Sequence, residues 1–272
     1  MAKNEAFDQG YGKLWTDVCV SHREGYRTSV NDYHEHDFYE INLILSGNVK
    51  ILLGDRSEEG TGKRLVLTRP GTPHYISCQP DVLYSRRYLM FSEDFVAGQI
   101  PEWQTLSAVF GNGGAILSLS EEETARICRI FEEIGREGDP LRRRLLIYYF
   151  LSLVSDRADA RGETGKQIPR YVVEVLNYID GHYGERIVAE ALARRLHVGR
   201  TTLLTAFKEY TGKTLGEYLT LCRLQHAEGY LRAGKTIEYT AARCGFSDAS
   251  GLVRSFKRCY GTTPRRYVER RK

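Results

Sequence analysis

The chain has 272 residues, of which 42% are hydrophobic and 27% are charged, a composition typical of globular domains rather than of disordered or fibrous chains. This length is sufficient for two domains with separate cores. Charged residues recur through the first thirty positions and no later stretch reaches the length of a membrane span, so we expect a cytoplasmic protein without a signal peptide or membrane contact. The six cysteines include no C-x-x-C pair, which argues against a zinc finger or a disulfide framework.

Charge is distributed unevenly along the chain. Residues 1–169 contain 20 Lys and Arg against 25 Asp and Glu, whereas residues 170–272 contain 19 against 10. A basic C-terminal third attached to a mildly acidic body favours a module that binds a polyanion such as nucleic acid. A basic surface that is merely solvated is the alternative.

Turn residues separate short apolar runs between residues 33 and 89, as in EINLILSGNVKILLGD and RLVLTRPGTPHYISC. This pattern predicts several strands of a β-rich unit. Between residues 101 and 118 the periodicity is poor, and FGNGG indicates a loop.

Two helices are predicted after the β-rich unit. Ser120, with Glu123 three residues later, forms the pattern of a capping box, and Pro140 begins a second helix that is apolar over much of its circumference between residues 141 and 155. Such a helix needs a partner, which is either the β domain or the same helix of a second subunit. The stretch RADARGETGKQIP that follows has little apolar content and predicts a linker.

Within the basic third, LLTAFKEYTGKTLGEY, from Leu203, and LVRSFKRCYGTTPRRY, from Leu252, align without gaps at an offset of 49 residues. Six of the sixteen positions are identical, which indicates a duplicated supersecondary unit. Each copy follows a short amphipathic helix and a turn, and each has an apolar inner face that includes Phe207 or Phe256. This is the plan of a helix-turn-helix, whose second helix lies in the DNA major groove. A helical bundle without a role in DNA binding shares the apolar spacing but leaves the basic charge unexplained.

The stretch AARCGFSDASGLVRSFKRCYGTTPRRY resembles the signature of AraC/XylS-type transcription regulators, in which Ala, Gly-Phe, a helix with Phe-Lys, and then Gly, Pro and Tyr follow one another. The resemblance covers residues 171–267. It implies two helix-turn-helix units joined by a long helix, here residues 215–232, that enter successive major grooves of double-stranded DNA. The chain departs from the family at Gly199, where a serine commonly caps the first recognition helix, and at Thr240 and Gly251.

Position within the resemblance assigns the DNA contacts. Base contacts are expected from Arg200, Thr201, Leu204 and Thr205 in the first unit and from Ala249, Ser250, Val253 and Arg254 in the second. Arg254 is the strongest candidate because a guanidinium can donate two hydrogen bonds to guanine. Phosphate contacts, which raise the affinity for any sequence, are expected from Lys208, Lys257, Arg258, Arg265 and Arg266. For each of these residues a solvated surface side chain is the alternative.

The segment HEHDFYE carries a different motif. Alternate side chains of a strand share a face, so His34, His36 and Glu40 point the same way, and His74 in PGTPH arrives from a later strand. The set resembles the cupin motif H-x-H-x3-E-x6-G, completed here by Gly47 and followed by P-G-x-x-H.

Three interpretations of these four residues remain open. They line the pocket of a small effector, they hold a divalent metal such as Fe, Mn, Ni or Zn, or they are wall residues whose nitrogens are satisfied by carbonyls and carboxylates. The first interpretation, a pocket for a small effector, requires no cofactor. Further side chains could line the same pocket: Trp15, Arg27, Arg69, Arg86 and Arg87.

We therefore expect an α+β protein with a cupin-like β-barrel over residues 1–118, a helical dimerisation segment over 119–156, a linker over 157–169 and an all-α double helix-turn-helix domain over 170–272. The expected function is ligand-responsive, sequence-specific control of transcription, without enzymatic activity. The resemblance implies a sugar-like effector, a homodimer, and RNA polymerase as a partner if the protein is an activator. A cupin metalloenzyme fused to a DNA-binding module and a purely architectural DNA binder are the alternatives from other classes.

Overall fold

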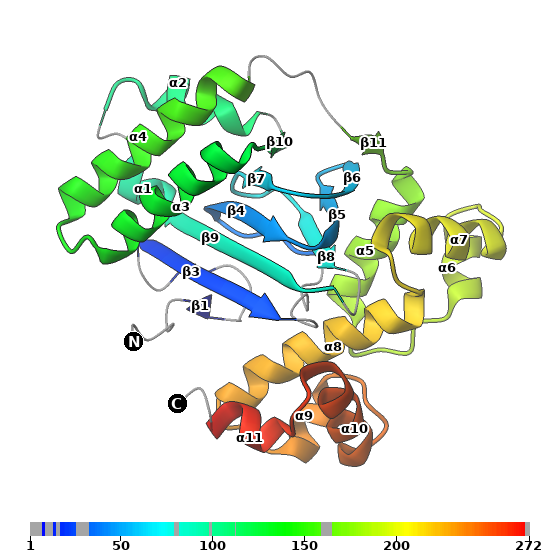
Figure 1. The fold of residues 1–272 in the computed structure, drawn as a ribbon. Coiled ribbons are helices and arrows are strands. Elements are labelled where there is room, and N and C mark those ends of the chain that lie inside the picture. The colour runs from blue at the N-terminus through cyan, green and yellow to red at the C-terminus, as the bar shows by residue number, and fades with distance from the viewer. Residues whose placement is uncertain are drawn as a thin grey trace.

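The computed structural model describes residues 7–8, 13–14, 17–25, 33–78, 82–97, 100–111, 113–158 and 165–269. Within them an N-terminal β domain with flanking helices precedes a helical C-terminal region (Figure 1), which agrees with the predicted α+β class. Trp15 and Arg27, considered above as pocket residues, lie outside the described residues, as does the middle of the predicted linker, residues 159–164.

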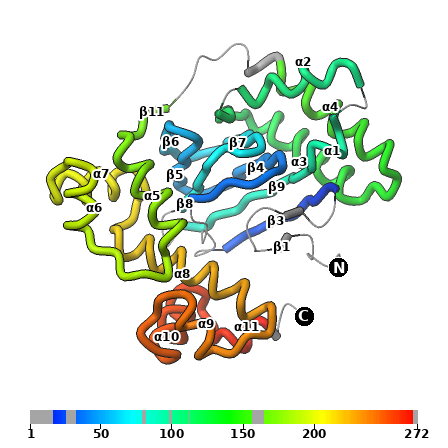
Figure 2. Tube along the Cα trace, turned by 180° about the vertical axis from the view of Figure 1, so that it is seen from behind, coloured from blue at the N-terminus to red at the C-terminus, as the bar shows by residue number. Residues whose placement is uncertain are grey.

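The described strands form three antiparallel sheets. One has the order β10-β7-β4-β9-β3, another has the order β11-β6-β5-β8, and β1 pairs with β2. Side chains from both larger sheets meet in one interior core, and Figure 2 shows these sheets from behind. The strands are β1 (Phe7–Asp8), β2 (Lys13–Leu14), β3 (Val18–Gly25), β4 (Phe38–Ser46), β5 (Asn48–Leu53), β6 (Arg56–Thr61), β7 (Arg64–Thr68), β8 (His74–Cys78), β9 (Tyr84–Ser92), β10 (Ala115–Ser118) and β11 (Lys166–Gln167).

Strand β4 separates two differently occupied faces of its sheet. Ile41 and Leu43 are fully buried in a cluster shared with the flanking helices. Ile44 packs into the interior core between the sheets, and the two-residue period of a strand places Glu40 and Asn42 on that same interior face. The outer face of the strand is therefore apolar, whereas its inner face carries the polar Glu40 and Asn42 as well as Ile44.

Two helices, α3 (Glu121–Arg136) and α4 (Pro140–Ala158), cover the outer face of the five-stranded sheet (Figure 1). The capping box predicted at Ser120 and Glu123 is present with both of its reciprocal hydrogen bonds. Helix α4 continues to Ala158, so it includes the first residues of the predicted linker. Three short helices precede this pair: α1 (Glu93–Val96), α2 (Trp103–Ser107) and the 3₁₀ helix η1 (Ala108–Phe110).

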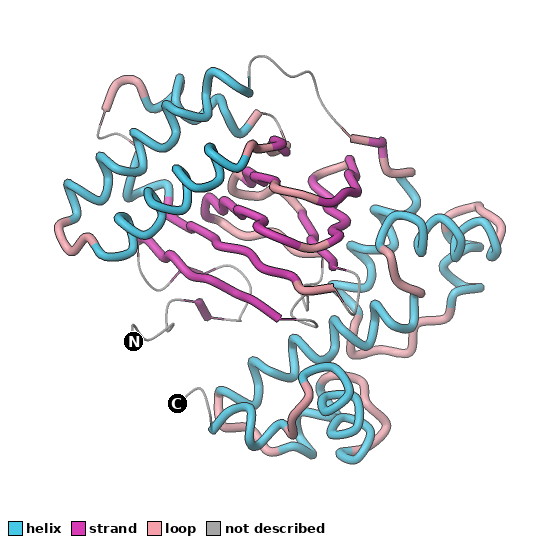
Figure 3. Tube along the Cα trace, viewed as in Figure 1, coloured by secondary structure: helices cyan, strands magenta, loops and turns pink. Residues whose placement is uncertain are grey.

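The C-terminal region consists of helices joined by loops and turns (Figure 3). Its elements are α5 (Arg170–His182), α6 (Ala189–Arg195), α7 (Arg200–Thr211), α8 (Leu215–Arg232), α9 (Ile237–Arg243), α10 (Ala249–Tyr260) and α11 (Pro264–Glu269). Helices α6 and α7 form one helix-turn-helix unit and α9 and α10 the other, and α8 joins them as predicted. No helix of the described residues is long and apolar enough to cross a membrane.

The sequence repeat corresponds to a repeated ring contact. Phe207 of α7 meets Tyr218 of α8 edge-on with ring centroids 5.4 Å apart, and Phe256 of α10 meets Tyr267 of α11 in the same way at 5.3 Å. Both phenylalanines are fully buried. Each unit is therefore held by the same aromatic pair in its own core.

The first helix-turn-helix unit packs directly on the β domain. Leu52 of β5 and Tyr75 of β8 belong to the same buried cluster as Phe207. Beside them, the Lys50 ammonium donates to the Glu209 carbonyl, and the Ser77 hydroxyl donates to the Thr211 carbonyl at 3.4 Å. The β domain and the first unit therefore share one hydrophobic core.

Besides β1 and β2, which pair with each other before the predicted β region, three strands differ from the sequence-based expectation. Strand β3 precedes the predicted β region and pairs with β9 over eight positions, and β10 pairs with β7 inside a segment of poor periodicity. Strand β11 lies within the predicted linker and pairs with β6. All three are added to existing strands, whose free N–H and C=O groups can order a segment that has little strand pattern of its own.

Candidate functional sites

The four residues of the histidine motif meet inside the β domain. Each of His34, His36, Glu40 and His74 offers a ligand atom, and these atoms all lie within 4.8 Å of one another. His34 and His74 are held by a short backbone bridge with N···O distances of 3.1 and 2.8 Å. The turn before His74 contains Gly71 at φ +70°, a conformation that glycine adopts at little cost.

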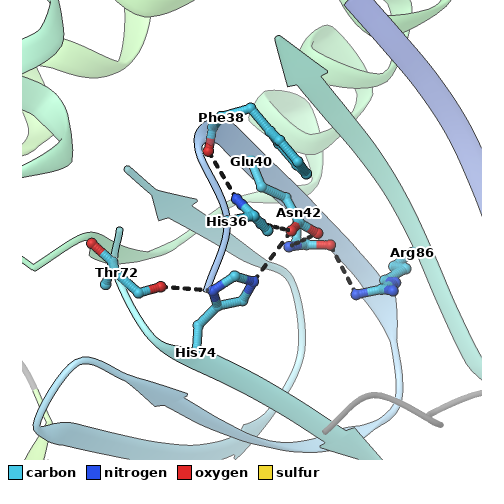
Figure 4. A network of polar contacts seen from close by, with 7 residues as sticks. All are labelled: His36, Phe38, Glu40, Asn42, Thr72, His74 and Arg86. Atoms are coloured by element: carbon cyan, nitrogen blue, oxygen red, sulfur yellow. Dashed lines mark hydrogen bonds and ion pairs between the residues drawn. The ribbon is translucent and has the colours of Figure 1, made fainter. Parts of the chain in front are cut away.

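Backbone carbonyls fix the orientation of two of the imidazole rings (Figure 4). His36 Nδ1 donates to the Phe38 carbonyl at 3.0 Å, and His74 Nδ1 donates to the Thr72 carbonyl at 2.9 Å. A carbonyl can only accept, so Nδ1 carries the proton in both rings. The Nε2 atoms are thereby left to face the interior.

Both Nε2 atoms approach the same carboxylate oxygen. His36 Nε2 lies 2.8 Å and His74 Nε2 lies 3.2 Å from Glu40 Oε2. Burial raises the pKa of Glu40, but the hydrogen bonds from His36 and His74 outweigh it and hold that pKa well below its usual range. The arrangement brings two imidazole nitrogens to one carboxylate oxygen, a set of atoms that could also hold a cation.

A polar chain leads from this carboxylate into the same interior. Asn42 Nδ2 donates to Glu40 Oε1 at 2.9 Å, and Arg86 Nη1 donates to Asn42 Oδ1 at 3.0 Å (Figure 4). Asn42 is fully buried and Arg86 is 5% exposed. Buried polar groups with defined partners offer directed donors and acceptors, which is what recognition of a small polar molecule requires.

The predicted base contacts lie at the start of the second helix of each unit. On α7, Arg200, Thr201 and Thr205 are exposed and Leu204 is half-buried. On α10, Ser250 and Arg254 are exposed, while Ala249 and Val253 are half-buried. The opposite faces carry the buried core residues Leu203, Phe207, Leu252 and Phe256, so each helix presents a free face to a partner.

A hollow of about 570 Å³ lies between α8 and the exposed side of α10. Its lining includes the arginines Arg223, Arg254 and Arg258. The Arg223 guanidinium donates to the carbonyls of Tyr183 and Glu185, so its position is set by the turn before α6. Three guanidinium groups around one hollow create a positive field beside the predicted recognition face.

Comparison with known proteins covers both parts of the chain. Residues 17–151 match the family described as AraC-like ligand binding domain, and residues 192–270 match a helix-turn-helix domain family. The HTH-type transcriptional activator RhaS of Escherichia fergusonii is 24% identical over 241 residues, 85% of each chain. The activator RhaR of Klebsiella pneumoniae is 24% identical over 268 residues, 93% of this chain and 92% of its own. The crystal structure of ToxT from Vibrio cholerae covers 93% of this chain and 97% of its own, with 14% identity and a TM-score of 0.44.

The chain belongs to the AraC family. It is accordingly a DNA-binding transcription regulator whose N-terminal part is a ligand-binding domain. The resemblance seen in the C-terminal signature is thus confirmed, and it extends to the β domain that carries the histidine cluster.

The two recognition helices of this AraC-family regulator begin differently. Asp248 is the N-cap of α10, and its side chain accepts from the Gly251 N–H at 2.6 Å. Gly199 occupies the equivalent place before α7 and provides no side-chain cap. The departure from the family noted at Gly199 therefore leaves the first recognition helix with a weaker start.

The remaining basic residues of the regulator lie where phosphate contacts are possible. Five side chains are exposed on or near the second helix of a unit: Lys208, Lys257, Arg258, Arg265 and Arg266. Their contact with phosphate remains a prediction.

Some functional candidates could not be identified from the motif alone. Asn42 was not considered, although it shares the strand period of Glu40, and that period is the signal that could have found it. Arg86 joins the interior network, whereas Arg87 pairs with Glu132 of α3 at 2.7 Å and Arg69 donates to the Gly111 carbonyl. Of the described arginines proposed for the pocket, only Arg86 is hydrogen-bonded into this network.

Proposed function

We propose that this regulator is a cytoplasmic, non-enzymatic activator of transcription that binds a specific DNA sequence as a homodimer and responds to a sugar-like metabolite. The observation that carries the proposal is the pair of exposed recognition faces, on α7 and α10, joined by α8 and coupled to a ligand-binding domain. The names of RhaS and RhaR, both transcriptional activators, support the activating role. RNA polymerase is then the partner on which activation depends.

The interior network supports a small polar effector. Glu40, Asn42 and Arg86 present a carboxylate, an amide and a guanidinium in one buried chain. Hydroxyl groups of a sugar both donate and accept hydrogen bonds, so they match such a mixed set. An apolar effector would make no use of these directed donors and acceptors.

Helix α4 supports the proposed dimer. Leu141, Leu145 and Tyr149 follow one another at four-residue spacing, and they are 58%, 54% and 47% exposed. Residues four apart lie on the same side of a helix, so the three form a continuous apolar stripe facing away from the β domain. An exposed apolar stripe of this kind marks a contact with another protein surface, and a second copy would cover it symmetrically.

Selection of binding sites from random duplex DNA tests the proposal. We expect the full chain to enrich one sequence, and we expect a compound from a panel of monosaccharides and sugar acids to change the affinity for that sequence. Equal affinity for the enriched and a scrambled duplex at matched salt would indicate an architectural DNA binder instead.

A metal-responsive regulator is the second candidate function. The Nδ1–H donors of His36 and His74 are engaged by carbonyls, which is how metal-binding histidines are commonly oriented by a second layer of contacts. Three imidazoles and a carboxylate suit Fe, Mn, Ni or Zn, and such an ion would supply positive charge beside the Glu40 carboxylate. His34, His36, Glu40 and His74 would hold it, and a metalloenzyme would be a special case of this candidate.

Metal analysis of the purified chain by mass spectrometry, with thermal shifts against Zn²⁺, Ni²⁺ and Mn²⁺ salts, distinguishes the two candidates. Close to one metal per chain, lost in the Glu40→Gln variant, would favour the metal-responsive regulator. Negligible metal together with a thermal shift from a sugar would favour the effector pocket.

A further inference from the structure

Two strand segments of the β domain have the histidine cluster on one side and the DNA-binding region on the other. In β8, His74 faces the cluster, and the next residue, Tyr75, points outward into the core shared with the first helix-turn-helix unit. The same is true of the neighbouring segment, where Tyr33 lies in that shared core and His34 in the cluster. Alternation along an extended chain produces this opposition.

Both outward tyrosines converge on one residue of the joining helix. The backbone N–H of Tyr33 donates to the Tyr218 hydroxyl of α8, and the rings of Tyr75 and Tyr218 meet edge-on with centroids 5.6 Å apart. Tyr218 is 1% exposed. Figure 1 shows the start of α8 beside β8 and the first helix-turn-helix unit.

Tyr218 in turn supports the first recognition helix. Its ring packs edge-on against Phe207, the buried residue on the inner face of α7. A continuous path therefore runs from the cluster to α7. It begins with the Glu40–His74 contact and the His34–His74 backbone bridge. It continues through Tyr33 and Tyr75, the residues next to these histidines, to Tyr218 and then to Phe207 of α7.

We infer that the Tyr218 hydroxyl couples the state of the histidine cluster to the placement of the first recognition helix. The inference rests on the proposed function, because it names how occupancy of that site reaches the DNA-binding region. A change at the cluster that moves His34 or His74 must displace the backbone bridge between them. Tyr33, whose N–H donates to the Tyr218 hydroxyl, directly precedes His34 in the chain. Tyr218 is a positioning residue in this scheme and touches no ligand.

The repeat supplies a comparison that separates the ring of Tyr218 from its hydroxyl. Tyr267 is the equivalent residue of the second unit and makes the same ring contact, with Phe256. Its hydroxyl, however, donates to Glu228 Oε1 at 2.7 Å, within the C-terminal region. The ring thus serves the fold of each unit, and the hydroxyl of Tyr218 accepts a backbone hydrogen bond from the β domain, whereas Tyr267 and Glu228 act on Arg23 of β3 electrostatically.

Hydrogen–deuterium exchange of the free full-length chain tests the inference without DNA or an effector. Glu40→Gln removes the charge on which His36 and His74 converge while keeping the size of the side chain. We expect it to accelerate exchange in the peptides of α7 and the first half of α8 by roughly two- to tenfold, the range that corresponds to one ordinary hydrogen bond. In Tyr218→Phe these peptides should already exchange faster, and adding Glu40→Gln should change them no further.

Tyr267→Phe is the matched control, since it also removes one hydroxyl from a repeated ring pair. In that background Glu40→Gln should keep its full effect on α7 and α8. Equal acceleration by Glu40→Gln with and without the Tyr218 hydroxyl would overturn the inference, and so would an absence of any change in α7 and α8 in the otherwise wild-type chain.

If Tyr218→Phe unfolds the first unit, Tyr33→Pro is the second variant, because proline lacks the N–H that donates to the Tyr218 hydroxyl and the change leaves the Phe207–Tyr218 pair intact. The same loss of response is expected from it, and a retained response would refute the coupling. Failure of the proposed function is detected separately, by a DNA selection that enriches no sequence.

Discussion

Arg254→Ala should reduce sequence discrimination more than affinity for DNA in general. Arg254 is exposed in the second turn of α10, on the face that carries Ser250 and opposite the buried Leu252 and Phe256. From there the guanidinium can donate two hydrogen bonds to one guanine, a contact worth about 1 to 3 kcal/mol of discrimination. The affinity for the selected duplex should therefore fall about 5- to 150-fold, with a smaller loss on a scrambled duplex.

Fluorescence anisotropy with both duplexes over a range of salt concentrations measures the two effects. Lys257→Ala is the matched control, because Lys257 is exposed on the same helix but is expected to contact a phosphate. It should weaken binding to both duplexes alike and reduce the slope of log K against log salt by about 0.9. If Arg254→Ala weakens both duplexes by the same factor and lowers the salt slope as Lys257→Ala does, the assignment of Arg254 to a base is wrong.

Three further predictions concern stability and assembly. Gly199→Ser should raise the free energy of unfolding, measured by urea titration, by about 0.5 to 1 kcal/mol. Gly199 already has the extended backbone of an N-cap, and the nearest atom to an added Cβ is Thr202 Oγ1 at 3.4 Å. A destabilised variant would contradict this prediction. Phe256→Leu should cost about 1 to 2 kcal/mol in the same assay through lost contacts with Tyr260 and Tyr267, and an unchanged midpoint would count against the proposed core. Leu145→Arg should halve the mass found by analytical ultracentrifugation, whereas a dimer that persists would place the interface elsewhere.

The elements with strong local patterns were predictable. The capping box at Ser120 and the inner face of each recognition helix follow from spacing within one turn or a few turns, whereas the extent of α8 was implied by the family resemblance. The histidine cluster was also accessible, because alternation along an extended segment places His36, two residues before β4, on the same side as Glu40, and the Pro-Gly turn returns the chain to His74.

Features that depend on distant contacts were not predictable. Strand β3 is strongly polar at its end, and it is ordered by pairing with residues of β9 that are 59 to 73 positions away. The contact between Tyr33 and Tyr218 joins residues separated by 185 positions. The exposed Lys166 and Gln167 carry no strand pattern and extend a sheet because β6 accepts them. In each case the partner, rather than the local sequence, determines the structure.

The two recognition faces are copies in architecture but not in chemistry. At the offset of 49 residues, the exposed arginine of the first face, Arg200, corresponds to Ala249, and the exposed arginine of the second, Arg254, corresponds to Thr205. A chain that places an arginine at the beginning of one recognition helix and further along the other cannot bind a duplex equally well in both orientations. With the proposed base contacts, we therefore expect a directional target, on which a single bound chain has a defined upstream and downstream side relative to the start of transcription.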